Sequence, residues 1–124
     1  MVRVTSVEEQ VFKLDHRIRY CGIIDGMGKV VSGGMRPGVS SLNSDAEEKK
    51  LVLQMTITSK MAETARLSLG KADLVIIRRK KVMLIGIPIR TGGAVLVATE
   101  PDFPLNIVES LSKLVRRSPG LKVR

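Results

Sequence analysis

Two glycine-rich segments contain the residue types that could bind a phosphate group. Residues 26–28, Gly-Met-Gly, match only part of a dinucleotide fingerprint, because no third glycine follows at the required spacing and the next residues predict a strand. We interpret them as a hairpin turn. In residues 32–38, the backbone amides of Gly33 and Gly34 could form an anion-binding nest, with the positive charge of Arg36 beside them. The alternative, which we favour, is that these glycines turn the chain from a strand toward the next helix.

Residues suited to catalysis or metal binding are few. His16 is the only histidine and Cys21 the only cysteine, and their spacing matches neither a metal site nor a Cys–His pair. Cys21 alternates with Gly22 in a predicted strand, so we expect a small buried side chain there. Asp25 lies at a turn, where we expect its carboxylate to bond to the backbone. The sequence therefore predicts no catalytic residue, no metal and no cofactor.

Positive charge is the second feature that could carry a function. The chain has 21 lysines and arginines against 12 acidic residues, a net charge of +9, which permits attraction to nucleic acid, anionic lipid or an acidic protein. The densest basic run is a predicted hairpin tip consisting of Arg78, Arg79, Lys80 and Lys81. A second cluster near the C-terminus consists of Arg116, Arg117, Lys122 and Arg124. These side chains could bind phosphates, or they could form an ordinary solvated surface. Aromatic residues make up 2% of the chain, too few to predict recognition by base stacking.

Length and composition predict one intracellular domain. The chain has 124 residues, of which 44% are hydrophobic, enough to close a single aliphatic core. A single cysteine excludes an internal disulfide. The first residues lack an apolar signal core, and the longest apolar run, residues 82–89, is about a third of a membrane span. We expect a cytoplasmic domain over residues 1–124, with residues 120–124 a frayed basic tail.

The hydrophobic pattern predicts the order helix, hairpin, long helix, three-stranded meander, helix. Apolar residues at steps of three and four predict helices over residues 7–17, from the cap Ser44 to Gly70, and from Pro104 to Pro119. Runs rich in valine, isoleucine and leucine predict strands at residues 20–24, 29–34, 73–79, 81–89 and 94–99. The simplest closure is an α+β sandwich with a five-stranded antiparallel sheet, whose edges are the strands at 29–34 and 73–79. The long helix would cover one face of this sheet and the two other helices the opposite face.

The long helix carries two apolar stripes where a helix with one buried side has one. The first stripe consists of Leu51, Met55, Thr58, Ala62, Ala65 and Leu69. The second consists of Leu53, Ile57 and Met61. Two stripes suggest two burial partners, which would be the helix's own sheet and another chain.

The edge strand that follows the long helix offers a matching surface. It contains the apolar run Leu74, Val75, Ile76 and Ile77. An uncovered apolar edge invites pairing with a second copy. We therefore expect a homodimer with twofold symmetry, in which this strand and the second stripe form the interface.

The order of elements resembles that of the roadblock / dynein light chain family. Residues 21–31, CGIIDGMGKVV, are similar to that family's first hairpin. Residues 33–38, GGMRPG, followed by the acidic start of a helix, also resemble a group of uncharacterised archaeal proteins. Longin and profilin folds share related layouts. The resemblance implies a dimeric platform without catalytic residues, which binds small Ras-like GTPases or scaffolds larger complexes.

The sequence leaves three functions open. The first is the non-catalytic dimeric scaffold or regulatory module that the resemblance implies. The second is a basic protein that binds nucleic acid or another anionic surface through residues 78–81. The third is a small-ligand sensor that uses the loop of residues 33–38.

Overall fold

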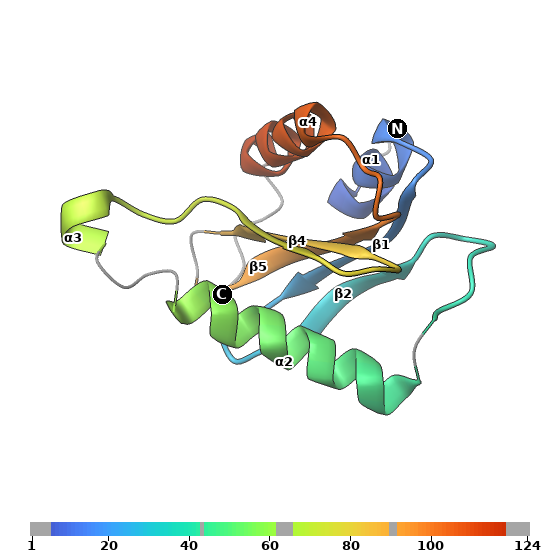
Figure 1. The fold of residues 1–124 in the computed structure, drawn as a ribbon, viewed down its shortest axis with the longest axis horizontal. Helices are drawn as coiled ribbons and strands as arrows, with labels where there is room; N and C mark the ends of the chain where they lie inside the picture. The colour runs from blue at the N-terminus through green and yellow to red at the C-terminus, as the bar shows by residue number, and fades with distance from the viewer. Residues whose placement is uncertain (1–5, 43, 62–65, 90–91, 119–124) are drawn as a thin grey trace, which may run out of the picture.

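The computed structural model describes residues 6–42, 44–61, 66–89 and 92–118. Its elements lie in three layers, with α2 on one face of a central sheet and with α1 and α4 on the other (Figure 1). In chain order the elements are α1 (Val7–Leu14), β1 (Ile18–Ile24), β2 (Val30–Met35), α2 (Asp45–Met61), α3 (Arg66–Leu69), β3 (Val75–Arg78), β4 (Met83–Pro88), β5 (Ala94–Thr99) and α4 (Leu105–Arg117).

The sheet has five antiparallel strands in the order β2-β1-β5-β4-β3. The last strand of the meander, β5, pairs with the first strand of the chain, β1, so that β2 and β3 form the two edges. This arrangement confirms the predicted α+β sandwich and its edges. None of the described helices combines the length and the apolar character that a membrane span requires.

Side-chain and backbone hydrogen bonds move several element boundaries from their predicted positions. Helix α1 ends at Leu14 instead of residue 17, because the Asp15 backbone is extended and its carboxylate accepts a hydrogen bond from the Arg17 amide at 2.8 Å. Strands β3 and β4 are shorter than predicted, because the Arg79 amide donates to the Val82 carbonyl at 2.7 Å and closes a turn between them. Helix α4 begins at Leu105, so Pro104 occupies the cap position and not the first position inside the helix.

The long helix also differs from its prediction. Instead of one helix to Gly70, the described residues form α2 and a separate four-residue helix, α3; residues 62–65, which include Ala62 and Ala65, lie outside the described residues. Leu69 was expected on the buried stripe but is 83% exposed. At 1.5 Å per residue α2 already spans about 26 Å, and five strands about 4.8 Å apart span roughly 19 Å. A longer helix would therefore extend past the sheet, and α3 lies well away from the strands, at the far left of the view (Figure 1).

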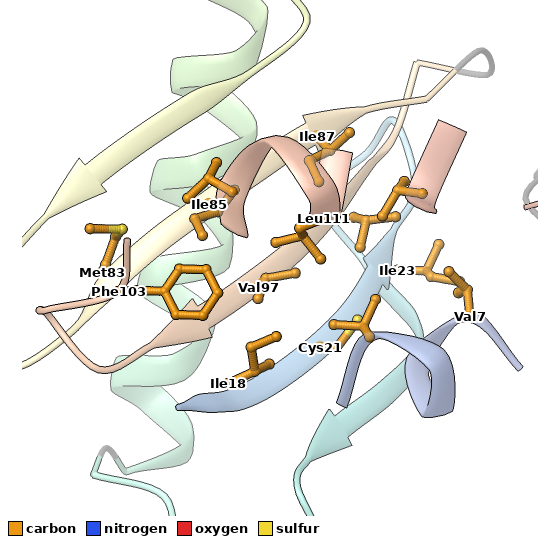
Figure 2. Packing of buried hydrophobic residues seen from close by; sticks show 14 residues of the cluster. Val7, Ile18, Cys21, Ile23, Met83, Ile85, Ile87, Val97, Phe103 and Leu111 are labelled. Carbon is orange, nitrogen blue, oxygen red and sulfur yellow. The ribbon is translucent and has the colours of Figure 1, made fainter. Parts of the chain in front are cut away.

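The core is divided by the sheet into two unequal clusters. The larger cluster lies under α1 and α4 and contains the ring of Phe103 together with side chains from β1, β4, β5 and α4 (Figure 2). The smaller cluster lies under α2 and consists of Tyr20, Ile24, Val52, Met55, Leu84 and Leu96. Most of the fold's apolar burial is thus on the face opposite α2.

Helix α2 is attached to the sheet through few side chains. Of its 17 residues only Val52 and Met55 are buried, and at about 1.5–3 kcal/mol each they contribute roughly 3–6 kcal/mol of burial. Met55 comes close to the sheet because β4 has a glycine beneath it: a Cβ at Gly86 would stand 2.6 Å from the Met55 sulfur. Val52 was not on the predicted inner stripe, whose Leu51 and Thr58 are only partly buried.

Gly33 is required by its position on β2. Its φ is +98°, a left-handed conformation that side chains disfavour, and a Cβ there would collide with the carbonyl oxygen of Cys21 on β1. Gly34 has no atom within 4 Å of the position that a Cβ would occupy. The two neighbouring glycines therefore make a matched pair, in which only the first is constrained.

We predict that Gly33→Ala lowers the free energy of unfolding by roughly 2 kcal/mol or more, through backbone strain and the clash with β1. Gly34→Ala should change it by less than about 1 kcal/mol, because it meets open space. Urea unfolding followed by circular dichroism measures both values. Equal losses for the two variants would contradict the assigned constraint.

Candidate functional site

The outward side of α2 presents an apolar stripe to solvent. Leu53, Ile57 and Met61 are 54%, 49% and 68% exposed, and their spacing of four residues places them on one face of the helix. They are the residues of the second predicted stripe, and none of them belongs to either core cluster of the described residues. We call these three residues the α2 stripe.

The β3 edge contributes less side-chain surface than the sequence suggested. Ile76 is 37% exposed, but Leu74 packs partly against the larger core cluster, and Val75 and Ile77 pack partly against the smaller one. Because β3 pairs with β4 alone, its other side is an open backbone edge. The edge therefore offers backbone hydrogen-bonding groups, with Ile76 as its main exposed apolar side chain.

The basic hairpin tip is exposed, as predicted. In the described part of the chain, no carboxylate lies within ion-pair distance of Arg78, Arg79, Lys80 or Lys81. This run lies between β3 and β4, so it marks one end of β3.

The second basic cluster is not next to the first. Arg116 on α4 forms an ion pair with Asp73 at 3.3 Å, and Asp73 precedes β3 whereas Arg79 follows it. Six residues of extended chain correspond to roughly 20 Å, so the structure does not gather the two clusters into one surface. Lys122 and Arg124 lie outside the described residues.

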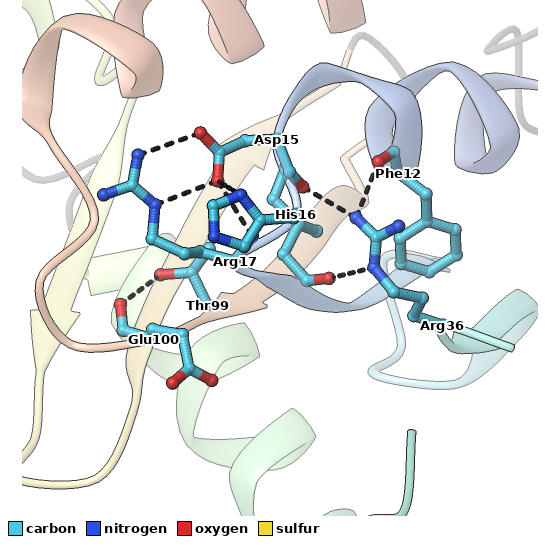
Figure 3. A network of polar contacts seen from close by, with 8 residues as sticks. Phe12, Asp15, His16, Arg17, Arg36, Thr99 and Glu100 are labelled. Atoms are coloured by element: carbon cyan, nitrogen blue, oxygen red, sulfur yellow. Dashed lines mark hydrogen bonds and ion pairs between the residues drawn. The ribbon is translucent and has the colours of Figure 1, made fainter. Parts of the chain in front are cut away.

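Arg36 binds the protein's own backbone. Its guanidinium donates to the carbonyl oxygens of Phe12 and Asp15 at 2.6 Å and of Ile18 at 2.7 Å, and it lies 5.1 Å from the centre of the Phe12 ring (Figure 3). Two of these carbonyls lie at the C-terminal end of α1, where helical carbonyls lack partners. Arg36 thus joins α1, β1 and the end of β2.

The contacts of residues 33–38 therefore indicate a role in stabilising the fold. Gly33 lies in β2 against β1, and Arg36 has at least three of its donor hydrogens directed to carbonyls. These contacts support the favoured interpretation, in which the glycines route the chain out of the sheet. A phosphate-bearing ligand at this segment would have to compete with those carbonyls for Arg36.

A close ion pair lies next to Arg36 in the same network (Figure 3). The Arg17 guanidinium donates to both carboxylate oxygens of Asp15, at 3.0 and 2.9 Å, and it also lies 5.7 Å from the centre of the Phe103 ring. The hydrogen bonds from Arg17 lower the pKa of Asp15 to about 2. The pair fixes the corner between α1 and β1.

Cys21, His16 and Asp25 have the residue types that could serve catalysis, but their surroundings in the fold do not form a catalytic arrangement among the described residues. Cys21 is fully buried, and this burial raises the pKa of its thiol to about 12, so that it is protonated at neutral pH. His16 is exposed on the surface beside Asp15. Asp25 accepts hydrogen bonds from the amides of Met27 and Lys29, which confirms its predicted role in the turn and lowers the pKa of its carboxyl group. Among the described residues no group of histidine, cysteine and acidic side chains is arranged to hold a metal ion.

A cleft between α2 and the sheet was not predicted from the sequence. Its volume is about 790 Å³, and we call it the α2 cleft. Its floor consists of sheet side chains, among them Tyr20, Leu84, Leu96 and Ala98, Val52 of α2 lines the helix side, and its rim includes Arg79, Lys80 and Lys81. The basic run was visible in the sequence, but its place beside a cavity depends on how the strands align.

Comparisons with known proteins bear on the fold. No sequence-family model matches the chain, and neither does any curated protein. Among solved structures, a roadblock/LC7 domain from Streptomyces avermitilis matches 93% of this chain and 96% of its own, with a TM-score of 0.64 and 11% identity. A structure of MglB with a tetrameric arrangement matches 94% of this chain and 90% of its own, with a TM-score of 0.61 and 14% identity.

A third solved structure is a profilin. LokiProfilin2, in a complex with rabbit actin, matches 90% of this chain and 91% of its own, with a TM-score of 0.54 and 11% identity. Together these likenesses confirm the predicted fold: the chain has a roadblock-like architecture, with a layout that profilins share.

We predict that Arg36→Ala lowers the free energy of unfolding by roughly 2 kcal/mol or more, because partly buried carbonyls lose a charged donor. Arg79→Ala, which removes an exposed arginine without an ion-pair partner among the described residues, should leave it nearly unchanged. Urea unfolding of both variants gives the comparison. If Arg36→Ala were as stable as Arg79→Ala, the guanidinium would be free for another role.

The Asp15–Arg17 pair predicts a specific loss of stability in acid. The folded pKa of Asp15 is about 2, below the ordinary value of about 3.9, so the stabilisation is present above about pH 4 and disappears as the pH falls toward 2. Asp15→Asn should lower the urea midpoint at pH 5 and should show a smaller further drop at pH 3 than the unmodified chain. The control is Glu109→Gln, which also removes a carboxylate, an exposed one on α4, and it should leave the urea midpoint at pH 5 nearly unchanged. An identical dependence in Asp15→Asn and the unmodified chain would contradict the prediction.

Proposed function

We propose that the chain is a non-catalytic, dimeric scaffold or regulatory module that acts in the cytoplasm by binding a partner protein. The observation that carries this proposal is the α2 stripe, three large apolar side chains on one helix face that are each about half exposed or more. A small Ras-like GTPase is one candidate partner, which the resemblance to the roadblock family implies.

The stripe and the β3 edge lie on neighbouring parts of the molecule and suit the same symmetry. Helix α2 covers one face of the sheet (Figure 1), and β3 is one of the two edge strands of that sheet. If two β3 strands pair antiparallel about a twofold axis, the two sheets continue into one another and the two α2 helices lie on the same face. Each stripe would then be removed from water by its copy, at about 25 cal/mol per Å² of apolar area buried.

The solved structures with the same architecture support association as the mode of action. The MglB structure is described as a tetrameric arrangement, and LokiProfilin2 is bound to actin. In both cases this fold occurs in contact with another chain. For the present chain, the α2 stripe offers an apolar surface to such a contact.

We predict that the unmodified chain sediments as a dimer at micromolar concentration and that Leu53→Glu or Ile57→Glu shifts it to a monomer. Each substitution would place two unpaired carboxylates in the interface of one dimer, at a cost of several kcal/mol. A rise in the dissociation constant of roughly 100-fold or more follows from a cost of about 3 kcal/mol. Analytical ultracentrifugation over a concentration series measures it.

A matched control lies on the opposite face of the sheet. Leu105 on α4 is 59% exposed, close to the 54% of Leu53, so Leu105→Glu makes the same chemical change at similar exposure. This variant should remain dimeric. A monomeric unmodified chain, or equal dissociation of Leu53→Glu and Leu105→Glu, would overturn the proposed interface.

A further inference from the structure

We propose that the α2 cleft binds an amphipathic anion, namely a carboxylate with an acyl chain of about ten to twelve carbons, a length that fits the floor described below. The acyl chain would lie along the apolar floor, and the carboxylate would face Arg79, Lys80 and Lys81. The inference is separate from the proposed dimer, because no residue of the α2 stripe lines the cleft.

The floor of the cleft is a row of side chains that crosses four strands. Tyr20 on β1 pairs with Met35 on β2 and with Ala98 on β5, and Ala98 pairs with Leu84 on β4. All four residues line the cleft. With strands about 4.8 Å apart, the row from Met35 to Leu84 is roughly 14 Å long. Ala98 is the smallest member of the row and stands between Tyr20 and Leu84, so the floor is lowest near its centre.

The charge around the cleft favours an anion. Its lining contains five basic residues and two carboxylates, those of Glu47 and Glu48. Glu47 is engaged in capping α2, where it accepts hydrogen bonds from the amide and the hydroxyl of Ser44 at 3.0 and 3.2 Å. Arg19 is likewise paired, with Glu100 at 3.1 Å. Glu48 and Lys50 on α2 carry opposite charges. Arg79, Lys80 and Lys81 have no ion-pair partner among the described residues, so the net positive charge is concentrated at the β3–β4 turn.

The dimensions favour a small ligand over a segment of a partner protein. The volume of about 790 Å³ lies within the range of ligand pockets, roughly 300–1,000 Å³. A helix with side chains is about 10 Å across, so it would fill this volume with fewer than two turns. A single acyl chain is much thinner and can lie between α2 and the sheet. An apolar floor that ends in free cations therefore matches a ligand with one apolar and one anionic end.

The chain contains a reporter for this cleft. Tyr20 is the only tyrosine, and the sequence has no tryptophan. The tyrosine fluorescence of the protein therefore comes from a single residue, which lies in the cleft floor. Its hydroxyl is buried without a hydrogen-bond partner among the described residues, and burial raises its pKa to about 12. Sodium decanoate is the probe, and its binding should change Tyr20 emission in a saturable way. Decanol, which lacks the charge, and butyrate, which lacks the chain, should bind at least 10-fold more weakly.

Two variants test the two ends of the site. Lys80→Glu combined with Lys81→Glu should weaken decanoate binding at least 10-fold. Its control is Lys113→Glu combined with Arg117→Glu, two exposed residues of α4 on the opposite face, which makes the same change in net charge and should leave binding unchanged. Ala98→Leu fills the centre of the floor without changing the net charge, and it should also weaken decanoate binding at least 10-fold. Circular dichroism and calorimetric titration of each variant verify folding and provide a second readout.

Three results would overturn the proposal. Decanol binding as tightly as decanoate would show that the basic rim plays no part. Decanoate binding that survives both the rim variant and Ala98→Leu would place the ligand elsewhere on the protein. Absence of decanoate binding, together with binding of a short oligonucleotide that the rim variant abolishes, would assign the basic turn to nucleic acid instead.

Discussion

The attachment of α2 to the sheet by two buried side chains is the constraint on which the rest of the structure depends. Met55 sits above Gly86, and Val52 is the other anchor. The opposite face of the sheet is covered by α1 and α4 with a much larger apolar cluster, closed around Phe103 and Leu111 (Figure 2). The sheet is therefore packed extensively against α1 and α4 on one face and only lightly against α2 on the other.

The shallow contact leaves two surfaces that a tightly packed helix would not have. Outward, α2 exposes Leu53, Ile57 and Met61 to solvent. Inward, its N-terminal half stands off the sheet and leaves the α2 cleft over Tyr20 and Ala98. Both surfaces are apolar, and they differ in their charge surroundings, since only the cleft borders the free cations of the β3–β4 turn. This difference is the physical basis for assigning the outer surface to a second copy and the inner one to an amphipathic anion.

The sequence predicted the architecture because its signals were local. Strand-forming runs, turn glycines and helix caps fixed the order of elements, and the order left one simple closure of the sheet. The side of α2 that faces the sheet was harder to predict, since Leu51, Val52 and Leu53 are consecutive apolar residues and periodicity does not show which one is the anchor. The role of Arg36 depends on carbonyls 18 to 24 residues away, and such contacts leave no pattern along the chain. The cleft was missed for a similar reason, because its floor exists only through the register that aligns Tyr20, Ala98 and Leu84.

The central claim is that the outward face of α2 lies against the same face of a second copy. A spin label at Gln54→Cys tests this directly, because residue 54 is exposed beside the stripe and the native Cys21 is buried and resists labelling. Packed helices lie about 8–10 Å apart axis to axis, so pulsed dipolar spectroscopy should give one short, narrow distance between the labels of two protomers. The absence of any intermolecular distance at micromolar concentration would contradict the claim.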